Sequence, residues 1–336
     1  MSGSGGESPR GAAPDERLGR LDPGAPVAPG TAAPSAGGSS VFATLLPHAR
    51  GDQINEFRWA LAGGVLALAL LVIAGLITAA ILLSALLVPV LYVMYLYEAR
   101  VYRDAPIPVV GVTLGGGLIL GIMVSALATR LVPGVPIVAS TPFGDSVDVA
   151  GLLLVGLALP LVKEVIKPWP AFLLRTRPDL SEPIDGLVLG IATGLGFSIA
   201  ETLIRFSQIL TAQGLDTSVA GWIYPLLSTA IFTPLIGGST TGLITAALWR
   251  YRRGSALNAV QLGALMVALG ASVAHVMGTT ILIEFGASRI VALGWELVIV
   301  AIVLFSVRLV LRRGLVEEAR ELGLPDPTAP AQRTDR

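Results

Sequence analysis

The chain has 336 residues, of which 53% are hydrophobic and 14% are charged, and its formal net charge is zero. Such an apolar composition is typical of a polytopic membrane protein, and the lack of a basic excess argues against a nucleic-acid partner. The absence of cysteine excludes disulfides, thiolate metal sites and a cysteine nucleophile. Frequent alanine, glycine and arginine with scarce lysine indicate a GC-rich bacterial coding bias.

Eight apolar stretches follow a tail that is rich in glycine, proline, alanine and serine. The tail, residues 1–55, cannot bury a core, so we expect it to be disordered and cytoplasmic. The expected helices cover residues 57–77, 79–98, 107–130, 149–172, 184–208, 222–249, 256–284 and 290–311. The predicted fold is therefore an all-α bundle of about eight transmembrane helices over residues 56–312, surrounded by membrane lipid, with a cytoplasmic C-terminal tail over 313–336.

Charged residues alternate between the predicted loops. Arginines precede the first helix and follow the second, fourth, sixth and eighth, whereas the opposite loops hold mainly acids. This pattern predicts a multi-pass protein of the plasma membrane with both termini in the cytoplasm. All five tryptophans lie near predicted helix ends, as an aromatic belt requires: Trp59, Trp169, Trp222, Trp249 and Trp295.

The fifth helix contains an acid on a face that is rich in glycine. Gly186, Gly190 and Gly194 recur every four residues, which predicts a groove for the backbone of another helix. At helical period Glu201 lies on the same face, so its carboxylate is expected to point into the bundle. An acid at membrane depth is costly and therefore marks a candidate functional site. Arg205, one turn later, either pairs with Glu201 inside the bundle or extends to the outer surface.

Two more polar positions lie in other helices. Lys163 and Lys167 are the only lysines of the chain, and they flank Glu164. Lys167 could pair with Glu164, or both lysines could extend from a cytoplasmic helix end to the membrane surface. His275 shares a helix face with small residues, and a lone histidine is more often a hydrogen-bonding residue than a ligand. Taken together, two carboxylates and an imidazole are suitable ligands for a divalent metal, which would activate a water for peptide hydrolysis.

The motifs LVKEVIK, DGLVLGIATGLGFSIAET, FTP and AHVMG resemble, in this order, those of the PrsW-type intramembrane metalloproteases, which are related to the CAAX-prenyl-protease-like membrane peptidases. The resemblance implies a helical protease that cleaves membrane-protein or peptide substrates with a metal-bound water, with zinc as the expected metal. By position, Glu164 and Lys167 match the EExxK-like segment, Glu201 the FAxxEN segment and His275 the late histidine. We therefore expect Glu164, Glu201 and His275 as metal ligands, and Glu164, Glu201 and Lys167 as catalytic residues.

Several family positions are substituted. Lys163 stands in place of a glutamate, Thr202 of an asparagine, Pro234 of a histidine and Gly278 of an amide or acid. In addition, straight helices would place Glu164 at a depth that differs from those of the other two ligands by roughly 10 Å. Two alternatives to a metal-dependent peptidase therefore stay open. One is a catalytically degenerate member that binds or regulates membrane proteins, and the other is a small-solute or ion transporter.

Overall fold

The computed structural model describes residues 55–98, 107–131, 149–177, 180, 182–214, 219–252 and 257–321. All of them belong to one compact unit. The tail expected over residues 1–55 lies outside these ranges except for its last residue, as do the acidic loop residues Asp145, Asp148 and Asp216. Throughout the described ranges the regular structure is helical, which confirms the all-α class.

The helices succeed one another with short breaks. Their bounds are α2 Asn55–Ile73, α3 Ile77–Glu98, α4 Ile107–Leu131, α5 Val149–Leu152, η1 Leu153–Ala158, α6 Leu159–Ile166, α7 Trp169–Leu173, η2 Leu174–Thr176, α8 Pro183–Gln213, α9 Val219–Pro225, η3 Leu226–Phe232, α10 Thr233–Arg252, α11 Ala259–Val273, η4 Ala274–Gly278, α12 Thr279–Glu284 and α13 Arg289–Glu321. Most bounds agree with the sequence-based ranges to within a few residues, and α13 continues ten residues beyond the predicted end.

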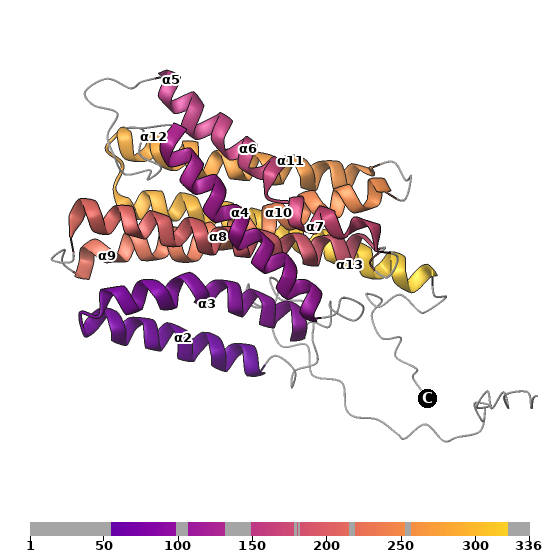
Figure 1. Cartoon of the computed structure of the whole chain (residues 1–336), viewed down its shortest axis with the longest axis horizontal. Helices are drawn as coiled ribbons and strands as arrows, with labels where there is room; N and C mark the ends of the chain where they lie inside the picture. Colours follow the sequence, from indigo (N-terminus) through magenta and orange to yellow (C-terminus); the bar gives the residue numbers. More distant parts are fainter. Residues whose placement is uncertain are drawn as a thin grey trace, which may run out of the picture. The chain divides into compact units, whose positions relative to one another are not determined.

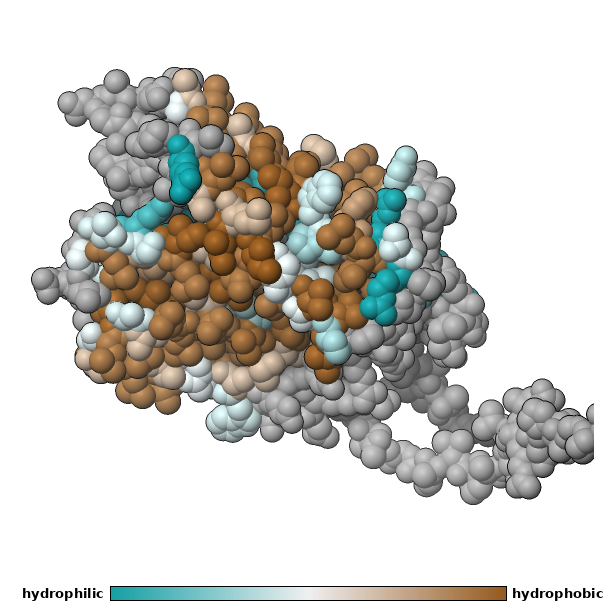
Figure 2. All heavy atoms as spheres, viewed as in Figure 1, coloured by the Kyte–Doolittle hydropathy of each residue, from teal (hydrophilic) through white to brown (hydrophobic). Residues whose placement is uncertain are grey.

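Among the described residues, six helical segments are long and apolar enough to cross a membrane. Two shorter segments complete the eight that were predicted: the apolar part of α2, Phe57–Ile73, and the run from α5 to α6. Figure 2 shows that the visible face of these helices is largely apolar, as contact with lipid acyl chains requires. Trp222 and Trp249 are fully buried in the bundle, so these two do not contribute to the expected aromatic belt.

Helix α8 occupies the centre of the bundle (Figure 1), packed against α10 and α4. The predicted glycine groove is confirmed, because a Cβ atom at Gly190 or Gly194 would lie 2.8 Å or 2.6 Å from a backbone carbonyl oxygen of α10. On another face, a Cβ atom at Gly196 would collide with the backbone of Leu114 in α4. These close approaches bury α8 almost completely, and its polar side chains therefore face other helices.

Three spans contain a wider π-helical turn. These turns are η1, η3 and η4, and each one shifts the face on which the following residues lie. Pro225 and Pro234 lie in the sixth span, and η3 lies between them, where missing backbone N–H groups weaken the regular ladder. Pro160 stands just after η1 in the same way. All three π-helical turns lie close to the polar residues described next.

Candidate functional site

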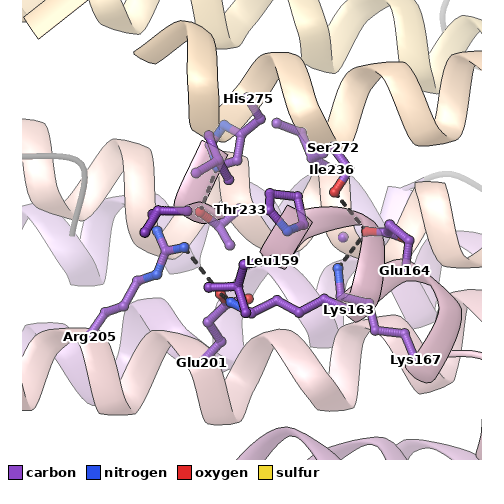
Figure 3. Close-up of a pocket in the computed structure, with 14 residues that line it drawn as sticks. Leu159, Lys163, Glu164, Lys167, Glu201, Arg205, Thr233, Ile236, Ser272 and His275 are labelled. Carbon is purple, nitrogen blue, oxygen red and sulfur yellow. Dashed lines mark hydrogen bonds and ion pairs between the residues drawn. The ribbon is translucent and has the colours of Figure 1, made fainter. Parts of the chain in front are cut away.

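A small polar cavity lies at membrane depth between α6, α8, α10 and η4 (Figure 3). Glu164, Lys167, Glu201 and His275, the four residues singled out from the sequence, all line it. Its volume of about 40 Å³ has room for ordered water, but not for a peptide segment. The sequence patterns therefore identified side chains that do converge in space, although they come from three different spans.

Glu164 lies on one side of this cavity and is almost completely buried. Its Oε1 atom accepts hydrogen bonds from Lys167 Nζ at 2.7 Å, Ser272 Oγ at 3.0 Å and Thr240 Oγ1 at 3.2 Å. Lys167 Nζ also lies 5.4 Å from the centre of the Phe197 ring. The pairing of Glu164 with Lys167 is therefore confirmed. The other carboxylate oxygen, Glu164 Oε2, is buried and has no hydrogen-bond partner within the described part of the chain.

Glu201 is held by two cations. Lys163 Nζ lies 2.6 Å and Arg205 Nη2 lies 3.1 Å from the same carboxylate oxygen, Glu201 Oε1. The interpretation of Arg205 as a buried partner is therefore confirmed, whereas the interpretation of Lys163 and Lys167 as surface-seeking residues is wrong. Both lysines are at most 7% exposed, because the acids that they neutralise lie inside the bundle.

His275 sits on a third side of the cavity, within the π-helical turn η4. Its Nε2 atom lies 3.4 Å from Thr233 Oγ1, and its Nδ1 atom lies 3.7 Å from a carboxylate oxygen of Glu296. Nδ1 therefore lies too far from Glu296 for a hydrogen bond. The histidine is thus oriented by neighbours in α10 and α13, and it is not bonded to Glu164 or Glu201 in this arrangement.

Glu296 was missed by the sequence analysis. It is 1% exposed and accepts a hydrogen bond from Ser228 Oγ at 2.7 Å and a long one from Thr279 Oγ1 at 3.5 Å. A signal was present, because Glu296 is the only acid in the apolar stretch 290–311, and an acid at membrane depth is a functional candidate by default. Glu296 lies outside the four motifs that resemble the protease family.

The expected difference in depth between Glu164 and Glu201 does not keep them apart. Lys163, the residue next to Glu164, contacts Glu201 directly. Straight helices were the assumption behind that difference, and η1 and Pro160 interrupt the fourth span just before these residues. The break changes the direction from which α6 approaches the centre of the bundle.

The charges around the cavity do not fit a divalent metal ion. Among the described residues no three His, Asp or Glu side chains are close enough together to hold one. Three cations line the cavity, Lys163, Lys167 and Arg205, against the two carboxylates Glu164 and Glu201. At an effective dielectric constant of about 20, a divalent ion about 4 Å from one ammonium group would be repelled by roughly 8 kcal/mol. Glu164, Glu201 and His275 therefore remain a predicted ligand set, and in this arrangement they are not close enough to share one metal ion.

Comparison with known proteins agrees with the motif resemblance. The family described as PrsW family intramembrane metalloprotease matches residues 105–311. No curated protein and no solved structure matches the chain. The matched segment contains all the polar residues around the cavity and runs from α4 to residue 311 within α13, so the comparison covers the candidate site completely.

Proposed function

Because the chain belongs to the PrsW family of intramembrane metalloproteases, we propose that it binds membrane-embedded segments of other proteins without cleaving them. The family implies a lipid environment, membrane-protein substrates and a divalent metal. In the proposed function the chain still lies in lipid and binds membrane proteins, but it holds no divalent metal. In this function the chain would be a catalytically degenerate member that regulates or sequesters membrane proteins.

The observation that carries this proposal is the contact between Lys163 Nζ and Glu201 Oε1 at 2.6 Å. Glu201 is the expected metal ligand, and the ammonium group of Lys163 occupies the carboxylate oxygen that would bind the metal. Arg205 approaches the same oxygen at 3.1 Å, so a metal ion at Glu201 Oε1 would have to displace two cations from a buried site. Removing one partner of a buried ion pair costs about 3–5 kcal/mol, because the other charge is left without compensation.

A metal-dependent peptidase is the second candidate function. It is favoured by the convergence of Glu164, Glu201 and His275 on one water-sized cavity. It is also favoured by two buried atoms of ligand type that have no hydrogen-bond partner among the described residues, Glu164 Oε2 and His275 Nδ1. This function requires a rearrangement in which Lys163 leaves Glu201, with zinc as the expected metal and with Glu164, Glu201 and Lys167 in catalytic roles. The family match favours both candidates over a transporter.

Reconstituted protein can separate the two candidates. Purified chain in proteoliposomes is combined with a panel of single-span model helices that carry a donor fluorophore, and the chain carries an acceptor. We expect energy transfer to at least one helix, no cleavage product by mass spectrometry, and metal well below one equivalent per chain. Addition of zinc should change none of these results.

The control for this experiment uses two carboxylates in different surroundings. Glu201→Gln removes the carboxylate at the cavity, and Glu317→Gln removes one in α13 that pairs with Arg250 of α10 and does not line this cavity. Cleavage that depends on zinc and disappears in Glu201→Gln but not in Glu317→Gln would reject the proposal and establish the peptidase. If energy transfer is no greater than the background from random encounters in the bilayer, and no cleavage product forms, both functions are rejected.

A further inference from the structure

A second and larger cavity lies at the side of the bundle, between the α2–α3 hairpin and helix α13. Its volume is about 260 Å³, and almost all of its walls are apolar, including Leu91, Leu304 and Val307. It shares no residue with the polar cavity around Glu201. Leu61 in the wall is 40% exposed, so the cavity opens onto the surface of the molecule.

The opening faces the apolar exterior. Helix α2 packs mainly against α3 and presents most of its large side chains outward, with Leu66 61% exposed. Figure 1 shows these two helices as a pair beside the rest of the bundle. A cavity between such a pair and α13 is reached from the bilayer, where acyl chains are the surrounding solvent.

One charged residue lines this apolar cavity. The Nε and Nη1 atoms of Arg308 are both buried, and neither has a hydrogen-bond partner among the residues that the structure describes. No acid lines the cavity with it. Buried donors without acceptors are costly, and a guanidinium group normally finds a carboxylate or a phosphate. The cavity therefore combines apolar walls with a cation that has two unsatisfied nitrogen donors.

Arg308 also lies at the basic end of the bundle. Arg312 and Arg313 follow it by one turn of α13, and Arg58 stands at the beginning of α2 next to Phe57, which lines the same cavity. Tyr95 lines the cavity too and adds a phenolic hydroxyl. Clustered basic residues and aromatic rings are typical of the level at which lipid headgroups lie, and basic pockets between helices hold anionic headgroups.

We propose that this cavity binds an anionic phospholipid, with the phosphate at Arg308 and an acyl chain along Leu91, Leu304 and Val307. The proposal goes beyond the function of the polar cavity and does not depend on it. A transmembrane helix, about 10 Å wide with its side chains, is too thick for a space of this volume, whereas a flexible acyl chain can follow it. The phosphate would supply the acceptor oxygens that Arg308 lacks.

Native mass spectrometry of the protein released from nanodiscs tests this binding. Nanodiscs contain dioleoyl phosphatidylglycerol and dioleoyl phosphatidylcholine in equal amounts, and the lipids that remain bound are counted. We expect one retained phosphatidylglycerol per chain and a preference of about tenfold or more over phosphatidylcholine. Both lipids carry a phosphate, but the choline ammonium group cancels the charge of phosphatidylcholine, whereas phosphatidylglycerol keeps a net negative charge for Arg308. Glycerol 3-phosphate added in detergent should not bind, because it lacks the acyl chains.

Three variants decide the outcome. Arg308→Gln should lose the preference for the anionic lipid, and Leu91→Trp should lose the retained lipid by filling the cavity while the charge remains. Arg289→Gln, an exposed arginine at the opposite end of α13, should behave like the unchanged protein. The proposal is overturned if the unchanged protein shows no preference, if Arg308→Gln retains it, or if glycerol 3-phosphate alone binds. A lipid-free dimer that disappears in Leu91→Trp would instead assign the cavity to a second copy of the chain.

Discussion

Glu201 neutralises two cations, whereas each of those cations has only a share of one acid. This asymmetry follows from the distances of 2.6 Å to Lys163 and 3.1 Å to Arg205. In a membrane interior the three charges depend on each other, because bulk water is not available to replace a missing partner. Removing the acid should therefore lower the free energy of unfolding more than removing either cation.

Glu201→Gln should destabilise the protein more than Lys163→Met does. The first change leaves two buried cations without a counterion and should cost about 3–5 kcal/mol, whereas the second leaves the Glu201–Arg205 pair intact and should cost less. Reversible unfolding in mixed detergent micelles measures both free energies. Glu317→Gln, at a partly exposed ion pair, is the matched control and should cost at most about 1 kcal/mol. If Glu201→Gln and Lys163→Met lower the free energy of unfolding equally, Glu201 does not stabilise both Lys163 and Arg205.

Lys163→Glu should create metal binding. It removes one of the three cations around the cavity and adds a third carboxylate to Glu164, Glu201 and His275. Carboxylate and imidazole ligands of this number suit zinc. We expect metal analysis after dialysis against zinc to rise from well below one to about one equivalent per chain. Lys163→Met is the control, since it removes the cation without adding a ligand; a similar rise there would show that charge alone excludes the metal.

Among the helices, α8 positions the site because it is closely packed against its neighbours on two faces. Its glycines let the backbones of α10 and α4 approach closely on two faces. Glu201, which pairs with Arg205 one turn later in the same helix, therefore meets Lys163 of α6 in a defined register. The π-helical turns η1, η3 and η4 then set the faces on which Lys163, Thr233 and His275 appear.

Gly196→Ala should separate α4 from α8. The added methyl group would collide with the backbone of Leu114, which cannot rotate away, so we expect a loss of about 1–3 kcal/mol or more in the free energy of unfolding. Gly115→Ala in the same helix pair is the matched control, since nothing lies within 4 Å of the added atom. That change should be neutral or stabilising by up to about 1 kcal/mol. If both changes cost the same, close packing at Gly196 is not what holds α4.

For the whole molecule, the family match and the apolar helices establish a multi-pass membrane protein. The orientation in the membrane rests on the loop charges alone, and we propose that both termini are cytoplasmic. The absence of native cysteines makes this orientation easy to test with single introduced cysteines.

Arg313→Cys and Ser288→Cys should be labelled from opposite sides of the membrane. The two positions flank the apolar stretch 290–311 of α13, and both are exposed. In intact cells a membrane-impermeant maleimide should react with Ser288→Cys only, and Arg313→Cys should react after the membrane is opened. Labelling of both variants, or of Arg313→Cys alone, in intact cells would contradict the proposed orientation.

The sequence by itself determined the all-α class, the positions of the helices, the glycine face of α8 and the polar residues that meet at the cavity. Each of these depends on local periodicity or on the cost of polar groups in lipid, and both can be recognised along the chain. Only the tertiary structure decided which charges pair. Glu201 could in principle have faced a metal or an arginine alone, but the break at η1 and Pro160 brings Lys163 to it.

The same limit explains Glu296 and Arg308. Both lie in the apolar stretch 290–311 of α13, and nothing in their neighbours along the chain indicates what they face. Packing across α13 puts Glu296 beside Ser228 and His275, and puts Arg308 in the wall of an apolar cavity. Partners of this kind come from residues far away in sequence, so their identity is a property of the folded bundle and not of any one helix.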